Sequence, residues 1–187
     1  MSSVVDICNR ALQKLGADRI TSLTENSVNA RECNAAYEIL RDAELRAHPW
    51  NFAVKRASLA ADPTTPDVYS YQYQLPSDFL RLLSHEEQTN STDYKIEGRY
   101  ILTNEGAPYK IRYIGIVTDP NQFDALFSEA LSARIAAELC EKITQSNTKI
   151  QQAKIDYRDA LREARKINAF EQVSQEPPED TWISARL

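Results

Sequence analysis

Four basic side chains near the end of the chain are its clearest candidates for a chemical role. They are Lys154, Arg158, Arg162 and Lys166. Residues four apart share one face of a helix, so this spacing predicts a basic stripe that can bind phosphates or an acidic partner. The alternative is an ordinary solvated face, because Asp156, Asp159 and Glu163 are within salt-bridge reach along the same helix. The sequence leaves both interpretations open.

Residues that would support catalysis or metal binding are few. The only histidines are His48, beside a proline, and His85, beside Glu86 and Glu87, and neither has an HExxH or paired-histidine spacing. We expect His85 to lie in an exposed turn. The four glycines form no phosphate-binding GxGxxG or GxxxxGK(S/T) loop, and no GxSxG elbow occurs. We therefore expect no enzyme, cofactor or metal site, although a catalytic triad assembled in space would leave no such pattern.

The composition indicates a soluble globular domain with a tail. The chain has 187 residues, of which 42% are hydrophobic and 26% charged, which is enough for one sizeable core. Its formal net charge of -5 argues against the broad basic surface that non-specific DNA binding requires. No apolar run approaches the ~20 residues that a membrane span needs, and residues 1–6 lack the features of a signal peptide. We expect no membrane association and a cytoplasmic location after synthesis.

The three cysteines are Cys8, Cys33 and Cys140. They are far apart in the sequence, have no CxxC spacing, and each falls at an apolar position of a helical pattern. We interpret them as buried thiols.

Helices are expected in both halves of the chain, over residues 3–15, 28–47, 120–144 and 148–168. Ser3 and Asp6 resemble a capping box at the start of the first helix, and Gly16 is a typical C-terminal cap. Ser27 is the expected N-cap of the second helix, which Pro49 ends. The first two helices should therefore form an antiparallel pair joined by a short loop.

The two later helices also have recognisable patterns. Asp119 and Pro120 predict the start of the third helix, because proline in the first turn loses no needed hydrogen bond. This helix is rich in alanine, and small side chains allow another helix to come close. In the fourth helix, apolar residues alternate spacings of three and four, which predicts a seam against another helix. They are Ile150, Ala153, Tyr157, Ala160, Ala164 and Ile167.

A β-sheet is expected between the second and third helices, within residues 51–117. Four prolines occur there, and alternation with a period of two replaces the helical spacing. The predicted strands run from Tyr69 to Leu75, Phe79 to Leu83, Tyr94 to Leu102 and Tyr109 to Ile116. The predicted fold class is α+β: a bundle of about four helices, one small inserted antiparallel sheet, and an extended tail after the domain of residues 1–170.

Aromatic residues suggest how the sheet packs. Tyr69, Tyr71 and Tyr73 share one face of the first predicted strand, which indicates either a core face or an interface, and we favour the core. Trp50 and Phe52, between the second helix and the sheet, are expected to pin one to the other. Their loss should unfold the domain.

The tail, residues 171–187, combines a polar, proline-bearing segment with large apolar side chains. The segment QEPPED cannot order itself by burying apolar surface, so Trp182, Ile183 and Leu187 indicate a docking element that requires a partner. Arg186 is the charged residue expected to accompany the Trp182 anchor. The alternative is that Trp182 folds back onto its own bundle.

Six segments together carry a resemblance to a known family. In chain order they are ALQKLG (11–16), ITSLTENS (20–27), HPWNFA (48–53), YQLPSDFLRLL (73–83), FSEALSARIAAELCEKIT (127–144) and DTWISAR (180–186). With them, the chain resembles the head-to-tail adaptor proteins of tailed bacteriophages, specifically the tail tubular protein A or gatekeeper family of short-tailed phages. Thr181 stands where that family has serine, and the loop from His85 to Asp93 matches no segment of the family.

The resemblance implies a structural virion protein. It implies a homo-oligomeric ring of twelve copies that binds the portal protein, receives the tail nozzle and continues the DNA channel for genome retention and ejection. DNA would pass through without sequence-specific binding. The protein would reside at the head-tail junction of the virion, and in the host cytoplasm during assembly. The resemblance also makes the portal, or a neighbouring copy, the expected partner of the tail. The alternative function is a small helical nucleic-acid-binding or regulatory protein that uses the basic stripe.

Overall fold

The computed structural model describes residues 3–64, 66–85 and 94–171 of the chain. The described helices are α1 (Val4–Leu15), α2 (Val28–Ala47), α3 (Ala125–Thr144) and α4 (Asn147–Phe170). The strands are β1 (Val54–Leu59), β2 (Tyr71–Gln74), β3 (Phe79–His85), β4 (Tyr94–Glu97), β5 (Tyr100–Thr103) and β6 (Tyr109–Gly115). Short 3₁₀ helices occupy Asn51–Ala53 and Pro120–Gln122. The α+β prediction with about four helices is confirmed.

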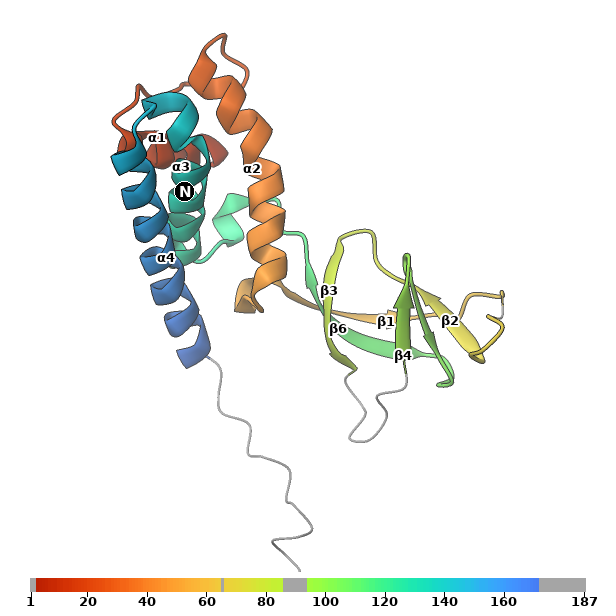
Figure 1. The fold of residues 1–187 in the computed structure, drawn as a ribbon. Coiled ribbons are helices and arrows are strands. Elements are labelled where there is room, and N and C mark those ends of the chain that lie inside the picture. Colours follow the sequence, from red (N-terminus) through yellow and green to blue (C-terminus); the bar gives the residue numbers. More distant parts are fainter. Residues whose placement is uncertain (1–2, 65, 86–93, 172–187) are drawn as a thin grey trace, which may run out of the picture.

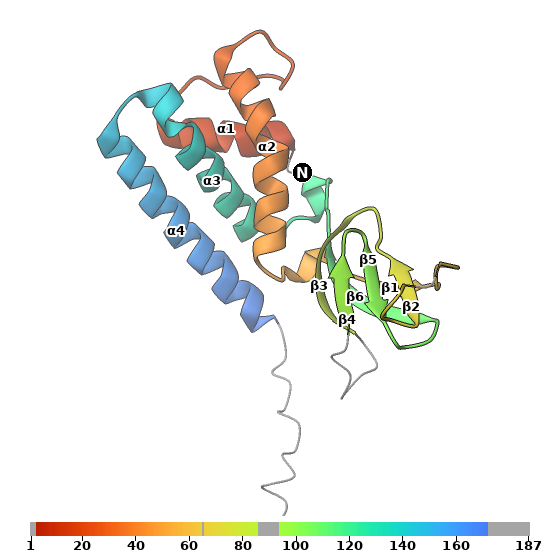
Figure 2. The same ribbon diagram turned by 45° about the vertical axis from the view of Figure 1, so that its right-hand side comes forward.

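The helices and the strands lie side by side as two lobes. α1 and α4 pack against α3, which also contacts α2, while all six strands gather beyond the C-terminal end of α2 (Figures 1 and 2). The bundle core is built from apolar residues of all four helices together with Trp50, Ala53 and Ile114. The alanine-rich character of α3 therefore corresponds to a helix with close helical neighbours.

The predicted caps of the first two helices are confirmed. The Asp6 backbone N–H donates to Ser3 Oγ at 3.1 Å, and the Ser3 backbone N–H donates to Asp6 Oδ2 at 3.0 Å, which completes a capping box. Gly16 ends α1 in the left-handed conformation, with φ of 70°. Ser27 caps α2 by accepting from the Ala30 N–H. All three cysteines are buried free thiols, as expected.

The predicted start of the third helix is wrong. Asp119 and Pro120 begin only a 3₁₀ turn, and α3 starts five residues later at Ala125. Asp124 is its N-cap, because Asp124 Oδ1 accepts from the N–H groups of Leu126 and Phe127. Both sites have an aspartate before a helical turn, so cap chemistry alone could not decide between them. The fourth helix extends one residue earlier and two residues later than predicted.

The single predicted sheet is in fact two antiparallel sheets of three strands each. Their strand orders are β1-β6-β3 and β2-β5-β4. The expected strand from Tyr94 to Leu102 is a hairpin, because Gly98, with φ of 58°, turns the chain between β4 and β5. Strand β1 has no counterpart in the prediction. His85 ends β3 rather than lying in a turn.

The two sheets share one core. Tyr73 and Ile101 of one sheet meet Tyr109 and Ile111 of the other, and the rings of Tyr73 and Tyr109 stack with centroids 4.9 Å apart. The tyrosine row of the sequence is therefore partly a core face: Tyr73 is fully buried, whereas Tyr71 stays 39% exposed. Strand β6 connects both lobes, since Tyr109 and Ile111 face the sheet core while Ile114 belongs to the bundle core.

Aromatic rings fill the junction between the lobes. Trp50 is fully buried and its Nε1–H donates to the Glu44 carbonyl at 2.9 Å. Phe127 at the start of α3 contacts Trp50 and Phe52, with ring centroids 5.0 Å apart in both pairs. Trp50 and Phe52 thus join the end of α2 to the start of α3, directly before the first strand.

Candidate docking site

All four members of the basic stripe lie on α4 and are exposed. Within the described residues, Arg162 is the one with a carboxylate partner, Asp159 at 3.3 Å, and both side chains are more than half exposed. Lys166 Nζ lies 5.9 Å from the centroid of the Phe170 ring. Among the residues that the structure describes, neither Lys154 nor Arg158 forms an ion pair. The solvated-face interpretation therefore fits Arg162 better than it fits Lys154 and Arg158.

Lys154 and Arg158 line a shallow hollow between α3 and α4. Arg134 of α3 contributes a third cation, Glu138 an acid, and Ala137 and Tyr157 apolar surface. The hollow is open to solvent and spans about 670 Å³. Arg134 was not singled out from the sequence, because it sits alone in an apolar, alanine-rich segment. Its spacing from Glu138 and Lys142 at i+4 and i+8 is the signal that could have identified an exposed face of α3.

A buried carboxylate lies beneath this hollow. Glu44 of α2 is only 5% exposed, and Tyr157 Oη donates to its Oε1 at 2.5 Å. Arg134 Nε is 3.9 Å from the same oxygen, and the Arg134 guanidinium lies 5.0 Å from the centre of the Tyr157 ring. Burial and the bond to Glu44 raise the pKa of Tyr157 to about 12, so it remains a donor at neutral pH. This network fixes the position of Arg134 and Tyr157.

The end of α4 is fastened to the segment after α2. Asn168 Oδ1 accepts from the Asn51 N–H at 2.9 Å, and Asn51 Nδ2 donates to the Asn168 carbonyl at 3.0 Å. Asn51 Nδ2 also donates to Glu171 Oε2 at 3.1 Å. These contacts fix Glu171, the first residue of the tail, at the junction between the lobes. The docking residues predicted from the sequence, Trp182, Ile183, Arg186 and Leu187, lie outside the described residues.

The segment YQLPSDFLRLL (73–83), one of the six that carry the resemblance, contributes a polar contact within the β1-β6-β3 sheet. Lys55 Nζ of β1 is 2.7 Å from Asp78 Oδ2, and Tyr113 Oη of β6 donates to Asp78 Oδ1 at 3.1 Å. Burial alone would raise the pKa of Asp78, but the bonds from Lys55 and Tyr113 outweigh it and lower that pKa. Arg46 of α2 donates to the Leu80 carbonyl in the same segment. The segment thus binds both the sheet and the bundle.

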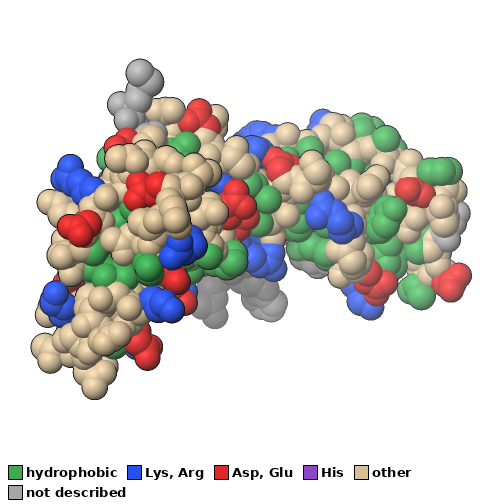
Figure 3. Space-filling model, turned by 90° about the horizontal axis from the view of Figure 1, so that it is seen from above, with side chains coloured by type: hydrophobic (Ala, Val, Ile, Leu, Met, Phe, Trp, Pro, Cys, Tyr) green, Lys and Arg blue, Asp and Glu red, His purple; other side chains and the backbone are tan. Residues whose placement is uncertain are grey.

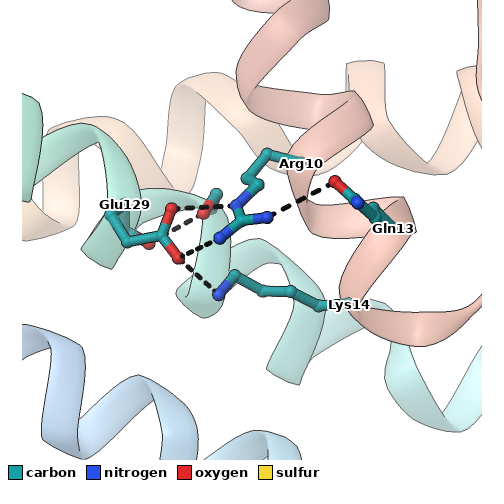
Figure 4. A network of polar contacts seen from close by, with 5 residues as sticks. Arg10, Gln13, Lys14 and Glu129 are labelled. Atoms are coloured by element: carbon teal, nitrogen blue, oxygen red, sulfur yellow. Dashed lines mark hydrogen bonds and ion pairs between the residues drawn. The ribbon is translucent and has the colours of Figure 1, made fainter.

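A second segment of the resemblance, the one that begins at Phe127, joins α1 to α3. Glu129 accepts from Arg10 Nε at 3.0 Å and from Lys14 Nζ at 2.6 Å, as Figure 4 shows. A terminal guanidinium nitrogen of Arg10 also donates to Glu129 Oε1, at 3.1 Å. The Arg10–Glu129 pair is therefore bidentate. The bond from Arg10 is the main cause of the lowered pKa of Glu129. The role of this cluster is to hold two helices together.

The charges seen from above are mixed. Lys and Arg side chains alternate with Asp and Glu over both lobes, and hydrophobic side chains are prominent on the β lobe (Figure 3). A large field of one sign, which non-specific nucleic-acid binding requires, does not occur on this face. Within residues 3–64, 66–85 and 94–171, no cluster of three or more His, Cys, Asp or Glu side chains could hold a metal ion.

Among the described helices, none combines the length and apolar character that crossing a membrane demands. Comparison with protein-family models found no match to this chain, and comparison with curated proteins found none either.

Proposed function

We propose that this chain is a structural subunit of a bacteriophage head-to-tail adaptor ring, which joins the portal to the tail nozzle and continues the DNA channel. The ring has twelve copies, DNA passes through it without sequence-specific contacts, and the subunit has no catalytic role. Its place is the head-tail junction of the virion, with the host cytoplasm as the site of assembly.

The observation that carries this proposal is the set of six segments, in order, in which the chain resembles the tail tubular protein A family. The five described segments supply residues at helix caps or at contacts between elements. Gly16 caps α1 and Ser27 caps α2. Asn51 fastens α4, Asp78 joins β1 to β6, and Glu129 joins α1 to α3. Two proteins with the same fold would be expected to have similar residues where elements are capped or in contact. The positions of these segments therefore support the resemblance.

The two-lobed shape also supports a ring. Neighbours in a ring meet head to tail through two different patches, so each subunit needs two unlike surfaces. The helical lobe has a hollow lined by three cations, whereas the β lobe has exposed apolar side chains, including Val68 at 83% and Ile96 at 41% exposed. A single chain with two such lobes has the surfaces that ring closure demands.

In this proposal the tail reaches the portal or a neighbouring subunit. Asn168 and Asn51 hold Glu171 against the body of the protein, so the sixteen residues that follow start from a fixed point. Trp182 is the apolar anchor and Arg186 its charged companion, with Ile183 and Leu187 adding apolar area. Trp and Arg are the residue types that most often dominate binding interfaces.

Electron microscopy of the purified protein, alone and mixed with the portal ring of its phage, tests the proposal. Rings stacked on the portal are the expected result, and particles that never join the portal would refute it. A variant ending at Glu171 retains the Asn51 and Asn168 contacts, so it should keep the helical signal and melting temperature of the full chain. It should fail to join the portal. A lower melting temperature would instead mean that the tail packs on its own bundle.

A second candidate function is nucleic-acid binding through the basic stripe, which the exposure of its four residues favours. Fluorescence anisotropy with a labelled duplex tests it. Binding that weakens steeply as salt is raised, and that is lost on replacing Arg162 and Lys166 with glutamine, would support this function. An adaptor with net charge -5 should show no such binding at physiological salt.

A further inference from the structure

From Ala130 to Cys140, helix α3 is covered except along one narrow face. In that span Arg134, Ala137 and Glu138 are exposed or half-buried and every other residue is buried, and the exposed Glu141 and Lys142 continue this face. The intervals between these residues alternate between three and one, which places them along one stripe of the helix. α2 and α4 flank this stripe, and α1 lies behind α3 (Figure 2).

The exposed face of α3 forms the floor of a trough. Two hollows meet there, the one between α3 and α4 and a second between α2 and α3, and Glu138 lines both. The second hollow has about 620 Å³ of open space and an apolar wall that includes Ala35, Ala36 and Ile39 of α2. We call the two hollows together the trough.

The α2 side of the trough combines apolar side chains with Glu32 and Lys142, whereas cations predominate on its α4 side. Ile39 is 71% exposed on the α2 side, and the alanines beside it leave room for an incoming side chain. On the α4 side, Arg134, Lys154 and Arg158 surround Glu138 as the one acid. Since Lys154 and Arg158 have no carboxylate partner within the described residues, this end is suited to an acidic, partly apolar partner.

A segment of matching character lies at the opposite end of the chain's own fold. The connection between β1 and β2, the gold segment farthest from α4 in Figures 1 and 2, carries Asp62 and Asp67 and neither Lys nor Arg. Val68 beside Asp67 is 83% exposed, and Tyr71 is 39% exposed. We call Asp62, Asp67, Val68 and Tyr71 the tip. Bonds from Thr64 and Gln72 lower the pKa of Asp62, so the tip stays anionic at neutral pH.

We propose that the trough of one copy receives the tip of the neighbouring copy. Val68 and Tyr71 pack on Ile39 and the adjacent alanines, and the carboxylates of Asp62 and Asp67 face the cations of α3 and α4. The trough and the tip are unlike surfaces at opposite ends of the molecule, so the contact repeats head to tail, which is the kind of contact that builds a ring. This inference rests on the proposed ring and names the surfaces that form it.

Cysteine cross-linking tests the contact directly. Ile39→Cys and Val68→Cys are made in separate chains, mixed with the portal, and treated with a short bis-maleimide, while the native cysteines are buried. Cross-linked dimers should form in the mixture and not with either variant alone. Rings on the portal without cross-linked dimers would overturn the inference and leave the proposed function intact. If neither rings nor cross-links form, both fail; cross-linked dimers without portal binding would support the contact and count against the adaptor function.

A charge exchange provides the second test. Arg158→Glu should weaken ring formation roughly tenfold, about 1.4 kcal/mol, because it places like charges together. Adding Asp67→Lys in the same chain should restore it. Arg162→Glu is the matched control, since Arg162 lies one turn further along the same helix and does not line the trough. Equal effects of the two arginine changes, or no restoration by Asp67→Lys, would overturn the proposed contact.

Discussion

Asn51 donates two hydrogen bonds to Asn168, one from its backbone and one from its side chain. Asn168 Oδ1 accepts from the Asn51 backbone N–H, and the Asn168 carbonyl accepts from the Asn51 side-chain amide. This assignment leaves Asn168 Nδ2 to donate to the Pro49 carbonyl at 3.2 Å and to His48 Nε2 at 3.1 Å. His48 must accept with a neutral ring, which agrees with a pKa lowered chiefly by burial. One side chain thus fastens the end of α4 to the whole segment after α2.

Replacement of Asn168 by alanine should therefore destabilise the protein. The Asn51 N–H and the Pro49 carbonyl would lose their partner in a largely buried place, which costs about 1–3 kcal/mol. Urea denaturation followed by circular dichroism measures the loss. Asn34→Ala is the matched control, because Asn34 is an exposed helical asparagine of α2. Equal unfolding free energies for the two variants would show that the Asn168 contacts contribute nothing.

Glu129 should make stability depend on pH. Its folded-state pKa lies below the ordinary value of 4.5, mainly because Arg10 bonds to the carboxylate. The stabilisation is therefore fully present above pH 4.5 and is lost as pH falls through the lowered pKa. At neutral pH, Glu129→Gln should cost about 1 kcal/mol or less, because the pairs are partly exposed.

Urea denaturation from neutral pH down to about pH 3 tests this prediction, because the difference between wild type and Glu129→Gln should shrink at the acidic end. Glu141→Gln is the control, since Glu141 is exposed on the same helix and forms no ion pair in the described part of the chain. A difference that stays constant with pH would contradict a role for the ionised carboxylate.

The fold could be predicted from the sequence where a local signal determines the outcome. Ser3, Gly16 and Ser27 have cap chemistry that acts within one turn, so the bounds of α1 and α2 were predicted closely. The division into two sheets could not be predicted, because it depends on which strands pair at long range. Strand β1 pairs with β6, whose residues lie fifty to sixty positions later, and no local pattern in residues 54–59 specifies that partner. The false start at Pro120 arose because a favourable helix start was followed by a second one at Asp124.

The candidate site was less accessible to sequence analysis. The spacing of Lys154 and Arg158 placed them correctly on one face of a helix, but their neighbour Arg134 comes from a different helix. Likewise, nothing in the sequence distinguishes Ile39 from the buried apolar residues of α2, yet its side chain is 71% exposed. Exposure follows from how α2 and α4 straddle α3 without closing over it, and this is a property of the packing rather than of any single helix.

Gly115 should not tolerate a side chain. An added Cβ would lie 2.7 Å from Lys55 Cδ and 2.9 Å from Asp78 Oδ2, and Asp78 is held in place by Lys55 and Tyr113. Gly115→Ala should therefore cost about 1–3 kcal/mol, as expected for overpacking. Gly106→Ala is the control, because nothing lies within 4 Å of its added Cβ. Thermal unfolding of both variants measures the effect, and a melting temperature equal to that of the control would show that the Lys55 and Asp78 contact can yield.

The two tryptophans should respond to alanine substitution in opposite ways. Trp50 is fully buried and bonded to the Glu44 carbonyl, so Trp50→Ala should cost about 3–5 kcal/mol, a large part of the stability of a typical domain. Trp182→Ala should leave the free protein unchanged if Trp182 anchors the tail on another subunit, and should abolish portal binding instead. Unfolding must be followed by far-ultraviolet circular dichroism, because each change removes a fluorophore. A loss of more than about 1 kcal/mol in Trp182→Ala would mean that this ring packs on its own chain, because substitutions at non-contacting surface positions change stability by less than that.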